Sequence, residues 1–108
     1  MGDLNKQVSV AISAASNGAN SIVAAVSGKK YRVVAWNFMS NGTVNAKWQD
    51  GSTDKTGLYY LVANTGISVP NPGTRIGWFE TSDNTALNLN LSGAVAVGGA
   101  IVYEEVAT

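Results

Sequence analysis

The sequence predicts an all-β protein: a single-domain antiparallel β-sandwich, jelly-roll-like, with about eight strands. Three observations predict it. Apolar and polar residues alternate along most of the chain, turn-forming residues recur about every 8–12 residues, and no segment sustains the three-four spacing of a helix. A chain of 108 residues fits one domain. A closed sandwich packs such strands with few exposed edges.

The first third of the chain predicts a flexible arm, two strands and a turn. Residues 1–7 are polar and form the expected N-terminal arm, and residues 8–108 form the sandwich domain. In residues 6–13, Val8, Val10 and Ile12 share one face, which is typical of a half-buried strand. Asn17-Gly18 predicts a turn, and residues 20–28 predict a second short strand that ends at Gly28.

The middle of the chain predicts a central strand followed by a hairpin. Residues 29–40 are apolar on both faces, with Val34, Trp36 and Phe38 on one and Tyr31, Val33, Ala35 and Met39 on the other. Such a strand is expected to be covered on both sides. Asn41-Gly42 is the strongest hairpin signal in the sequence. It should join this strand to residues 43–49, whose buried face is Val44, Ala46 and Trp48.

The remaining segments predict four more strands. Residues 50–57 read as a polar loop, residues 58–63 as a short strand, and residues 64–74 as irregular because Pro70 and Pro72 forbid a central strand. Residues 75–80 and 86–92 are two further strands. Gly98-Gly99 should interrupt the last strand as a bulge or a close approach of two backbones, and residues 100–106 complete it.

Composition excludes several classes of function. The net charge is zero and charged residues make up 13% of the chain, against about 25% in an average globular protein. We therefore expect no nucleic-acid partner and no membrane partner, since such binding needs clustered Lys and Arg. Low charge fits either a neutral monomer coated with Asn, Ser and Thr or, as we favour, a surface covered by neighbouring subunits. The sequence lacks cysteine and predicts no signal peptide or membrane span.

Catalytic chemistry is not expected. His is absent, and all carboxylates except Glu80 are predicted to lie in turns or at chain ends. Glu80 follows Trp78 and Phe79 and could be a carboxylic acid with a raised pKa, but pairing with Arg75 or a neighbouring subunit is the commoner role. Asp50 and Asp54 bracket a loop that could offer oxygen ligands to calcium, although a capped β-turn explains it equally well. We predict a non-enzyme without cofactor or metal.

The aromatic residues allow two interpretations. Trp36, Trp48, Trp78, Tyr59 and Tyr60 could form a platform on which sugar rings stack, but parity places Trp36 and Trp48 among buried residues. Tyr59 and Tyr60 point to opposite faces, so one of them should be exposed or at an interface. Trp78 could be a lid over the core or an anchor in a partner.

Six segments in a shared order resemble a known family. They read "KKYRVVAWNF", "TVNAKWQDG", "GLYYLVANTGISVPN", "GWFET", "ALNLNLSGAVAVGG" and "IVYEEV", and the likeness covers about residues 20–106. This order is similar to that of small virion proteins from tailed-bacteriophage genomes. The resemblance implies a structural part of the particle. We expect a head decoration (cement) protein, located on the capsid surface and assembled in the host cytoplasm.

The implied partners are the major capsid protein and further copies of the chain. Capsid symmetry favours a trimer, with a dimer as the second possibility. The expected contact residues come from the arm, the tyrosine pair and the proline-containing loop: Leu4, Asn5, Lys6, Tyr59, Tyr60, Pro70, Pro72 and Trp78. The alternative is a glycan- or receptor-binding module of a phage fibre or tail tip, for which a glycan would be the partner.

Overall fold

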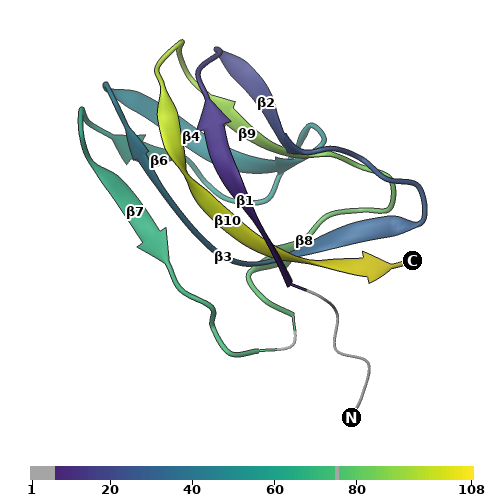
Figure 1. Ribbon diagram of the computed structural model, residues 1–108. Coiled ribbons are helices and arrows are strands. Elements are labelled where there is room, and N and C mark those ends of the chain that lie inside the picture. The colour runs from purple at the N-terminus through teal and green to yellow at the C-terminus, as the bar shows by residue number, and fades with distance from the viewer. Residues whose placement is uncertain (1–6, 75) are drawn as a thin grey trace.

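The computed structural model describes residues 7–74 and 76–108, and within them two antiparallel sheets pack face to face without a helix (Figure 1). The predicted β-sandwich is therefore confirmed. Sheet A contains β1 (Gln7–Ala14), β10 (Val97–Ala107), β3 (Lys29–Ser40), β7 (Gly66–Val69) and β8 (Phe79–Glu80). Sheet B contains β2 (Gly18–Val23), β9 (Leu87–Leu91), β4 (Val44–Asp50), β5 (Thr53–Asp54) and β6 (Tyr59–Leu61).

The strand pairing is that of a long antiparallel hairpin rolled into a sandwich. β1 pairs with β10, β2 with β9, β3 with β7 and β8, and β4 with β5 and β6, so the pairs are nested within one another. Pairs alternate between the sheets and give the orders β1-β10-β3-β7 and β2-β9-β4, with β6 beside β4. This is a jelly roll, as the sequence predicts.

The core lies between the sheets and is dominated by residues at alternate strand positions. Leu87, Leu89 and Leu91 point inward from β9 and are 0–1% exposed. Trp48 on β4 is fully buried and packs edge-to-face against Trp36 on β3, with ring centroids 5.9 Å apart. Both tryptophans are core residues, as parity predicts.

A β-bulge in β3 changes which of its residues face the core, so the predicted assignment of faces is wrong for part of this strand. The register between β3 and β10 shifts where Ala35 pairs with Val102 and Val33 pairs with Tyr103. Val34 is the extra residue on β3, so the alternation changes phase there. Tyr31 and Val33 consequently point into the core on the same side as Trp36 and Phe38, whereas the sequence placed the two pairs on opposite faces.

The outer face of β3 is also more open than the sequence predicts. Beyond the bulge, Asn37 and Met39 point away from the core, and Met39 is 56% exposed. The prediction that this strand is covered on both faces is therefore wrong for its second half. The strand is nevertheless central, because β10 and β7 flank it.

The Asn41-Gly42 segment does not form a hairpin. β3 belongs to sheet A and β4 to sheet B, so the segment carries the chain across the sandwich. Neither residue adopts the positive φ that the predicted turn needs. The Asn41 amide instead donates to Ala96 O at 2.8 Å. The tight hairpin lies at residues 50–53, where Gly51 has φ +62° and joins β4 to β5 inside the predicted polar loop.

Other boundaries differ by a few residues. β2 covers residues 18–23 rather than 20–28, and the segment predicted to be irregular contains β7, an edge strand that ends just before Pro70. The strand predicted at residues 75–80 is reduced to Phe79–Glu80, with Arg75 outside the described residues. Gln7, which the sequence assigned to the arm, is the first residue of β1 and pairs with Glu104.

Candidate functional site

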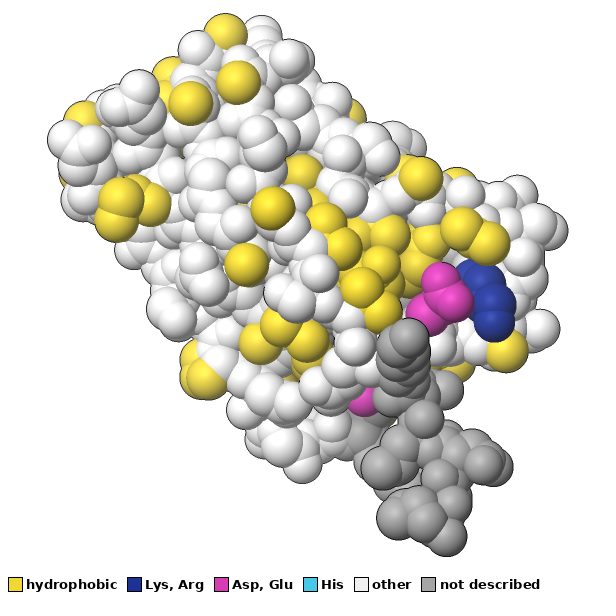
Figure 2. All heavy atoms as spheres, viewed as in Figure 1, with side chains coloured by type: hydrophobic (Ala, Val, Ile, Leu, Met, Phe, Trp, Pro, Cys, Tyr) yellow, Lys and Arg dark blue, Asp and Glu magenta, His cyan; other side chains and the backbone are white. Residues whose placement is uncertain are grey.

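Most of the outer face of sheet A is built from uncharged side chains, many of them small. Three rows run across its strands: Ser9–Val102–Ala35, Ala11–Ala100–Asn37–Ser68 and Ser13–Gly98–Met39–Gly66. Figure 2 shows this face, with charged side chains gathered at one end near the C-terminal part of β10 and few elsewhere in the view. Because these positions alternate with core residues, the face is set by the same pattern that builds the sandwich.

Three shallow hollows lie on the described part of this face. One of about 310 Å³ lies along β3 and β7 beside Asn37 and Ser68. Another of about 170 Å³ lies beside Ala35, Ala100 and Pro70. A third, of about 530 Å³, lies at the end of β1 and includes Met39 and Gly98. The surface is thus a broad, lightly grooved sheet face that offers van der Waals contact.

The outer face of sheet B has a different chemistry. Asn90 Nδ2 donates to Gln49 Oε1 at 3.1 Å, and Gln49 Nε2 donates to Asp54 Oδ1 at 2.8 Å. Lys47 Nζ also reaches Asp54 Oδ2 at 3.0 Å. The hydrogen bonds from Gln49 and Lys47 lower the pKa of Asp54. The polar groups of this face therefore bond largely to one another.

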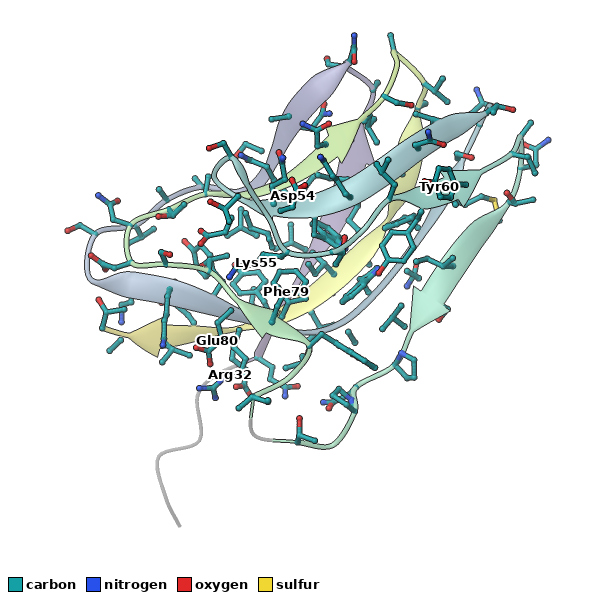
Figure 3. All side chains as sticks on the ribbon, turned by 180° about the vertical axis from the view of Figure 1, so that it is seen from behind. Arg32, Asp54, Lys55, Tyr60, Phe79 and Glu80 are labelled. Atoms are coloured by element: carbon teal, nitrogen blue, oxygen red, sulfur yellow. The ribbon has the colours of Figure 1, made fainter. Side chains whose placement is uncertain are left out.

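An ion-pair cluster closes one end of the sheet A face. Arg32 Nε lies 2.7 Å from Glu80 Oε2, and Arg32 Nη1 lies 3.1 Å from Glu104 Oε1. Lys30 Nζ lies 2.9 Å from Glu80 Oε1. Figure 3 shows Arg32 and Glu80 adjacent, with Asp54 and Tyr60 over sheet B. Glu80 is thus paired with Arg32 and Lys30, whereas the sequence suggested Arg75, which lies outside the described residues.

The cluster lowers the pKa of Glu80, whereas the sequence allowed a raised pKa for this carboxyl group. The hydrogen bond from Lys30, aided by Arg32, lowers the pKa of Glu80, although partial burial acts in the opposite direction. A general acid at neutral pH needs a raised pKa. The pKa of Glu80 is therefore shifted in the direction opposite to the one that such an acid needs.

We predict that Glu80→Gln lowers the free energy of unfolding by about 1 kcal/mol at neutral pH, because it removes two charge-assisted contacts. A lowered folded-state pKa gives stability that is present above the unfolded pKa of about 4.3 and lost as pH falls through the folded value. Urea unfolding of the variant should accordingly show a weaker loss of stability below about pH 4 than the parent. Glu105→Gln is the control, because Glu105 is exposed and 4.0 Å from Lys29. Equal effects of both variants would contradict the assignment.

The sequence predicts that Asp50 lies in a solvated turn, but the structure buries it. It is 7% exposed, and its carboxylate accepts from the Ser82 amide at 3.1 Å and the Ser82 hydroxyl at 2.8 Å. The exposed Asp54 binds Lys47 and Gln49 instead.

Within residues 7–74 and 76–108, no group of three or more His, Cys, Asp or Glu side chains could hold a metal ion. In the same ranges no helix is long and apolar enough to cross a membrane.

Among the predicted contact residues that the structure describes, Trp78 and Pro70 lie together, whereas Tyr60 lies on the other sheet. Tyr60 is 77% exposed on the outer face of sheet B, whereas Tyr59 points inward and packs on Phe38 at 5.9 Å. Pro70 is exposed and Pro72 half-buried in the loop after β7. Trp78 is 48% exposed, donates from Nε1 to Pro70 O at 2.8 Å and packs on Trp36. Leu4, Asn5 and Lys6 lie outside the described residues.

Sequence reasoning missed the outward rows of sheet A as a site. Ala11 and Ala100 carry no reactive group, so nothing in their chemistry marks them. A usable signal was present in the alternation, because the outward positions of residues 9–13 and 98–102 are Ser, Ala, Gly and Val without a charge. A solvated sheet face usually carries Lys or Glu at such positions.

The fold and the site define a jelly-roll β-sandwich. On the outer face of sheet A three adjacent rows of side chains lack charge and the ion pairs lie at one end, whereas the outer face of sheet B carries polar groups that bond to one another. No protein-family model matches this chain, and a search of curated proteins found no match.

Proposed function

We propose that this chain is a non-enzymatic structural protein of a phage particle: a decoration protein that binds the outer capsid surface as an oligomer and stabilises the head. The observation that carries the proposal is the outer face of sheet A, whose three rows contain no charged side chain. The resemblance of its segments to small tailed-phage virion proteins supplies the setting. The partner is the major capsid protein.

The chemistry of the face suits contact with another protein. Interface cores are depleted in charged residues, because each buried charge must be desolvated and paired. Ser, Ala and Gly lose little side-chain entropy on burial, so a broad contact is not opposed by ordering of long side chains. An oligomer that touches several capsid subunits gains affinity from each further contact. The proposed role therefore needs neither cofactor nor reactive group.

The polar segment of residues 1–6 is part of the proposal on sequence grounds alone. Leu4, Asn5 and Lys6 would order against the capsid or a neighbouring copy. Loss of residues 1–6 should then weaken capsid binding without affecting the sandwich.

We predict that Ala100→Glu weakens binding to undecorated capsids of the encoding phage by more than about tenfold, because it buries an unpaired charge at the centre of the face. Ala100 is half-buried and points outward from β10, so the fold should tolerate the change. Cosedimentation with capsids measures the effect. Ala19→Glu is the matched control, since Ala19 is exposed on the outer face of sheet B. Unchanged binding by A100E, with the fold intact by circular dichroism, would exclude this face as the contact.

The second candidate is a glycan- or receptor-binding module of a fibre or tail tip. It is favoured by Tyr60, whose ring is 77% exposed beside the polar side chains of sheet B. An exposed aromatic ring offers a stacking surface for a sugar. A glycan screen separates the candidates: specific binding that Tyr60→Ala abolishes supports the module, and capsid binding without glycan binding supports decoration.

A further inference from the structure

The edge of sheet A formed by β1 is long and unprotected. β1 pairs with β10 along its whole length, from Gln7 opposite Glu104 to Ala14 opposite Val97, and no other strand of the described chain pairs with it. Its eight residues, QVSVAISA, contain no charge, proline, glycine or register shift. A free edge of this kind presents unpaired backbone N–H and C=O groups to any other strand.

The other edge strands have features that hinder pairing with a further strand, and β1 lacks these features. β7 is four residues long and is followed directly by Pro70. β5 and β6 are two and three residues long. β2 begins with Gly18 and has a register shift between Ser21 and Val23. Short strands, prolines and bulges are the usual means by which proteins block edge pairing, so their absence from β1 alone sets this edge apart.

The apolar side chains near this edge are incompletely covered. Val8 and Val10 point inward from β1 yet are only half-buried, whereas Ile12 is 2% exposed. β2 contacts β1 across the sandwich, and the two strands lie side by side in Figure 1. The rim made by β1 and β2 therefore leaves apolar surface that a neighbour at the same edge would bury.

We propose that the β1 edge pairs with β1 of a second copy of this chain, antiparallel, about a two-fold axis at Val10 or Ala11. Such pairing is self-complementary: an axis at Val10 sets Val8 opposite Ile12 of the second copy, and an axis at Ala11 sets Ser9 opposite Ser13. Inward residues then meet inward residues, and sheet A continues across the dimer.

The absence of charge on β1 fits a second copy, and the β2 edge would add to the contact. β1 holds no charged residue and the chain has zero net charge, so two copies meet without repulsion. A standard interface covers about 800 Å² on each partner, which one strand edge alone does not supply. The β2 edge lies on the same side, so both sheets contribute to the contact. The pairing selects the dimer, the second of the two oligomers expected from the sequence.

Single-cysteine crosslinking tests the pairing cleanly, because the chain has no cysteine of its own. Directly opposed residues in an antiparallel pair have Cα atoms about 4.5–5.5 Å apart, within the range of about 4.4–6.8 Å that a disulfide spans. Val10→Cys or Ala11→Cys should therefore form a covalent dimer on mild oxidation. Ser68→Cys, exposed on the opposite edge, should not.

Light scattering after size exclusion gives the independent measurement. The parent chain should have twice the monomer mass, and Val10→Lys should shift it to the monomer. The two ammonium groups are then directly opposed for an axis at Val10 and diagonal neighbours for an axis at Ala11, so they repel in either register. Val69→Lys on β7 is the control, since Val69 is also a half-buried edge valine and should leave the dimer intact. Circular dichroism verifies the fold, and the exposed Ala11→Cys stands in should Val10→Lys fail to fold.

A monomeric parent, a trimer, or a dimer that crosslinks at neither Val10 nor Ala11 would overturn the inference. The proposed function is a separate matter, because capsid binding through the outer face of sheet A can fail while the dimer persists. The dimer can likewise fail while A100E still abolishes capsid binding.

Discussion

Trp48→Ala is expected to lower the free energy of unfolding by about 3–5 kcal/mol, the range for truncating a fully buried large aromatic residue. Trp48 is 0% exposed, and its ring packs against Trp36 at 5.9 Å and Phe38 at 6.3 Å. It thus joins β4 of sheet B to β3 of sheet A. Since a domain of this kind is stable by only about 5–15 kcal/mol, the variant should be close to unfolding at room temperature.

Trp78→Ala is the control, measured by urea unfolding alongside Trp48→Ala. Trp78 is 48% exposed and packs on Trp36, with ring centroids 6.4 Å apart. Its removal loses part of an aromatic contact and one hydrogen bond to Pro70 O, for an expected cost of about 1 kcal/mol. Comparable losses for the two variants would mean that Trp48 is not the centre of the core.

The sequence predicts the sandwich well because its strongest signal is the alternation itself. Inward positions such as Leu87, Leu89 and Leu91 can be assigned without knowing which strands pair. Where the chain departs from strict alternation, the prediction fails. The bulge at Val34 reverses the phase of residues 29–33. The sequence does not reveal this bulge, because it arises from the pairing of β3 with Tyr103, some 70 positions away along the chain.

The hairpin at Asn41-Gly42 fails for a related reason. The turn preference of this dipeptide would pair β3 with β4. In the structure β3 pairs with β10 and β4 with β9, both distant in sequence, and these pairings prevail. The chain crosses between sheets here, held by the Ser40 amide on Thr65 O and the Asn41 amide on Ala96 O. Tertiary contacts thus override the local preference of the dipeptide.

The candidate site was harder to predict than the fold because its residues carry no charged or reactive group. Exposed aromatic residues attracted attention, yet Tyr59 packs into the core and Tyr60 lies on the opposite sheet from Trp78. The absence of charge from outward positions is visible in the sequence. That these positions line up as rows across β1, β10, β3 and β7 requires the register, which alternation alone does not provide.

Gly99→Ala should cost about 3 kcal/mol or more, although it adds only one methyl group. A Cβ at Gly99 would lie 2.0 Å from Asn37 O and 2.7 Å from Phe38 Cα, both on the backbone of β3. Relief requires that β10 move away from β3, and this pair forms the centre of sheet A. The sequence prediction of a close backbone approach at Gly98-Gly99 is confirmed at Gly99, while β10 itself runs on without interruption.

Gly98→Ala is the matched control one residue away. A Cβ there meets only Ile12 O at 3.8 Å, an ordinary contact. Because alanine also restricts the unfolded chain, this variant should be neutral or more stable by up to about 1 kcal/mol. Thermal and urea unfolding of the two single variants measure the difference. Similar stabilities for G98A and G99A would show that β10 and β3 are not held this close at Gly99.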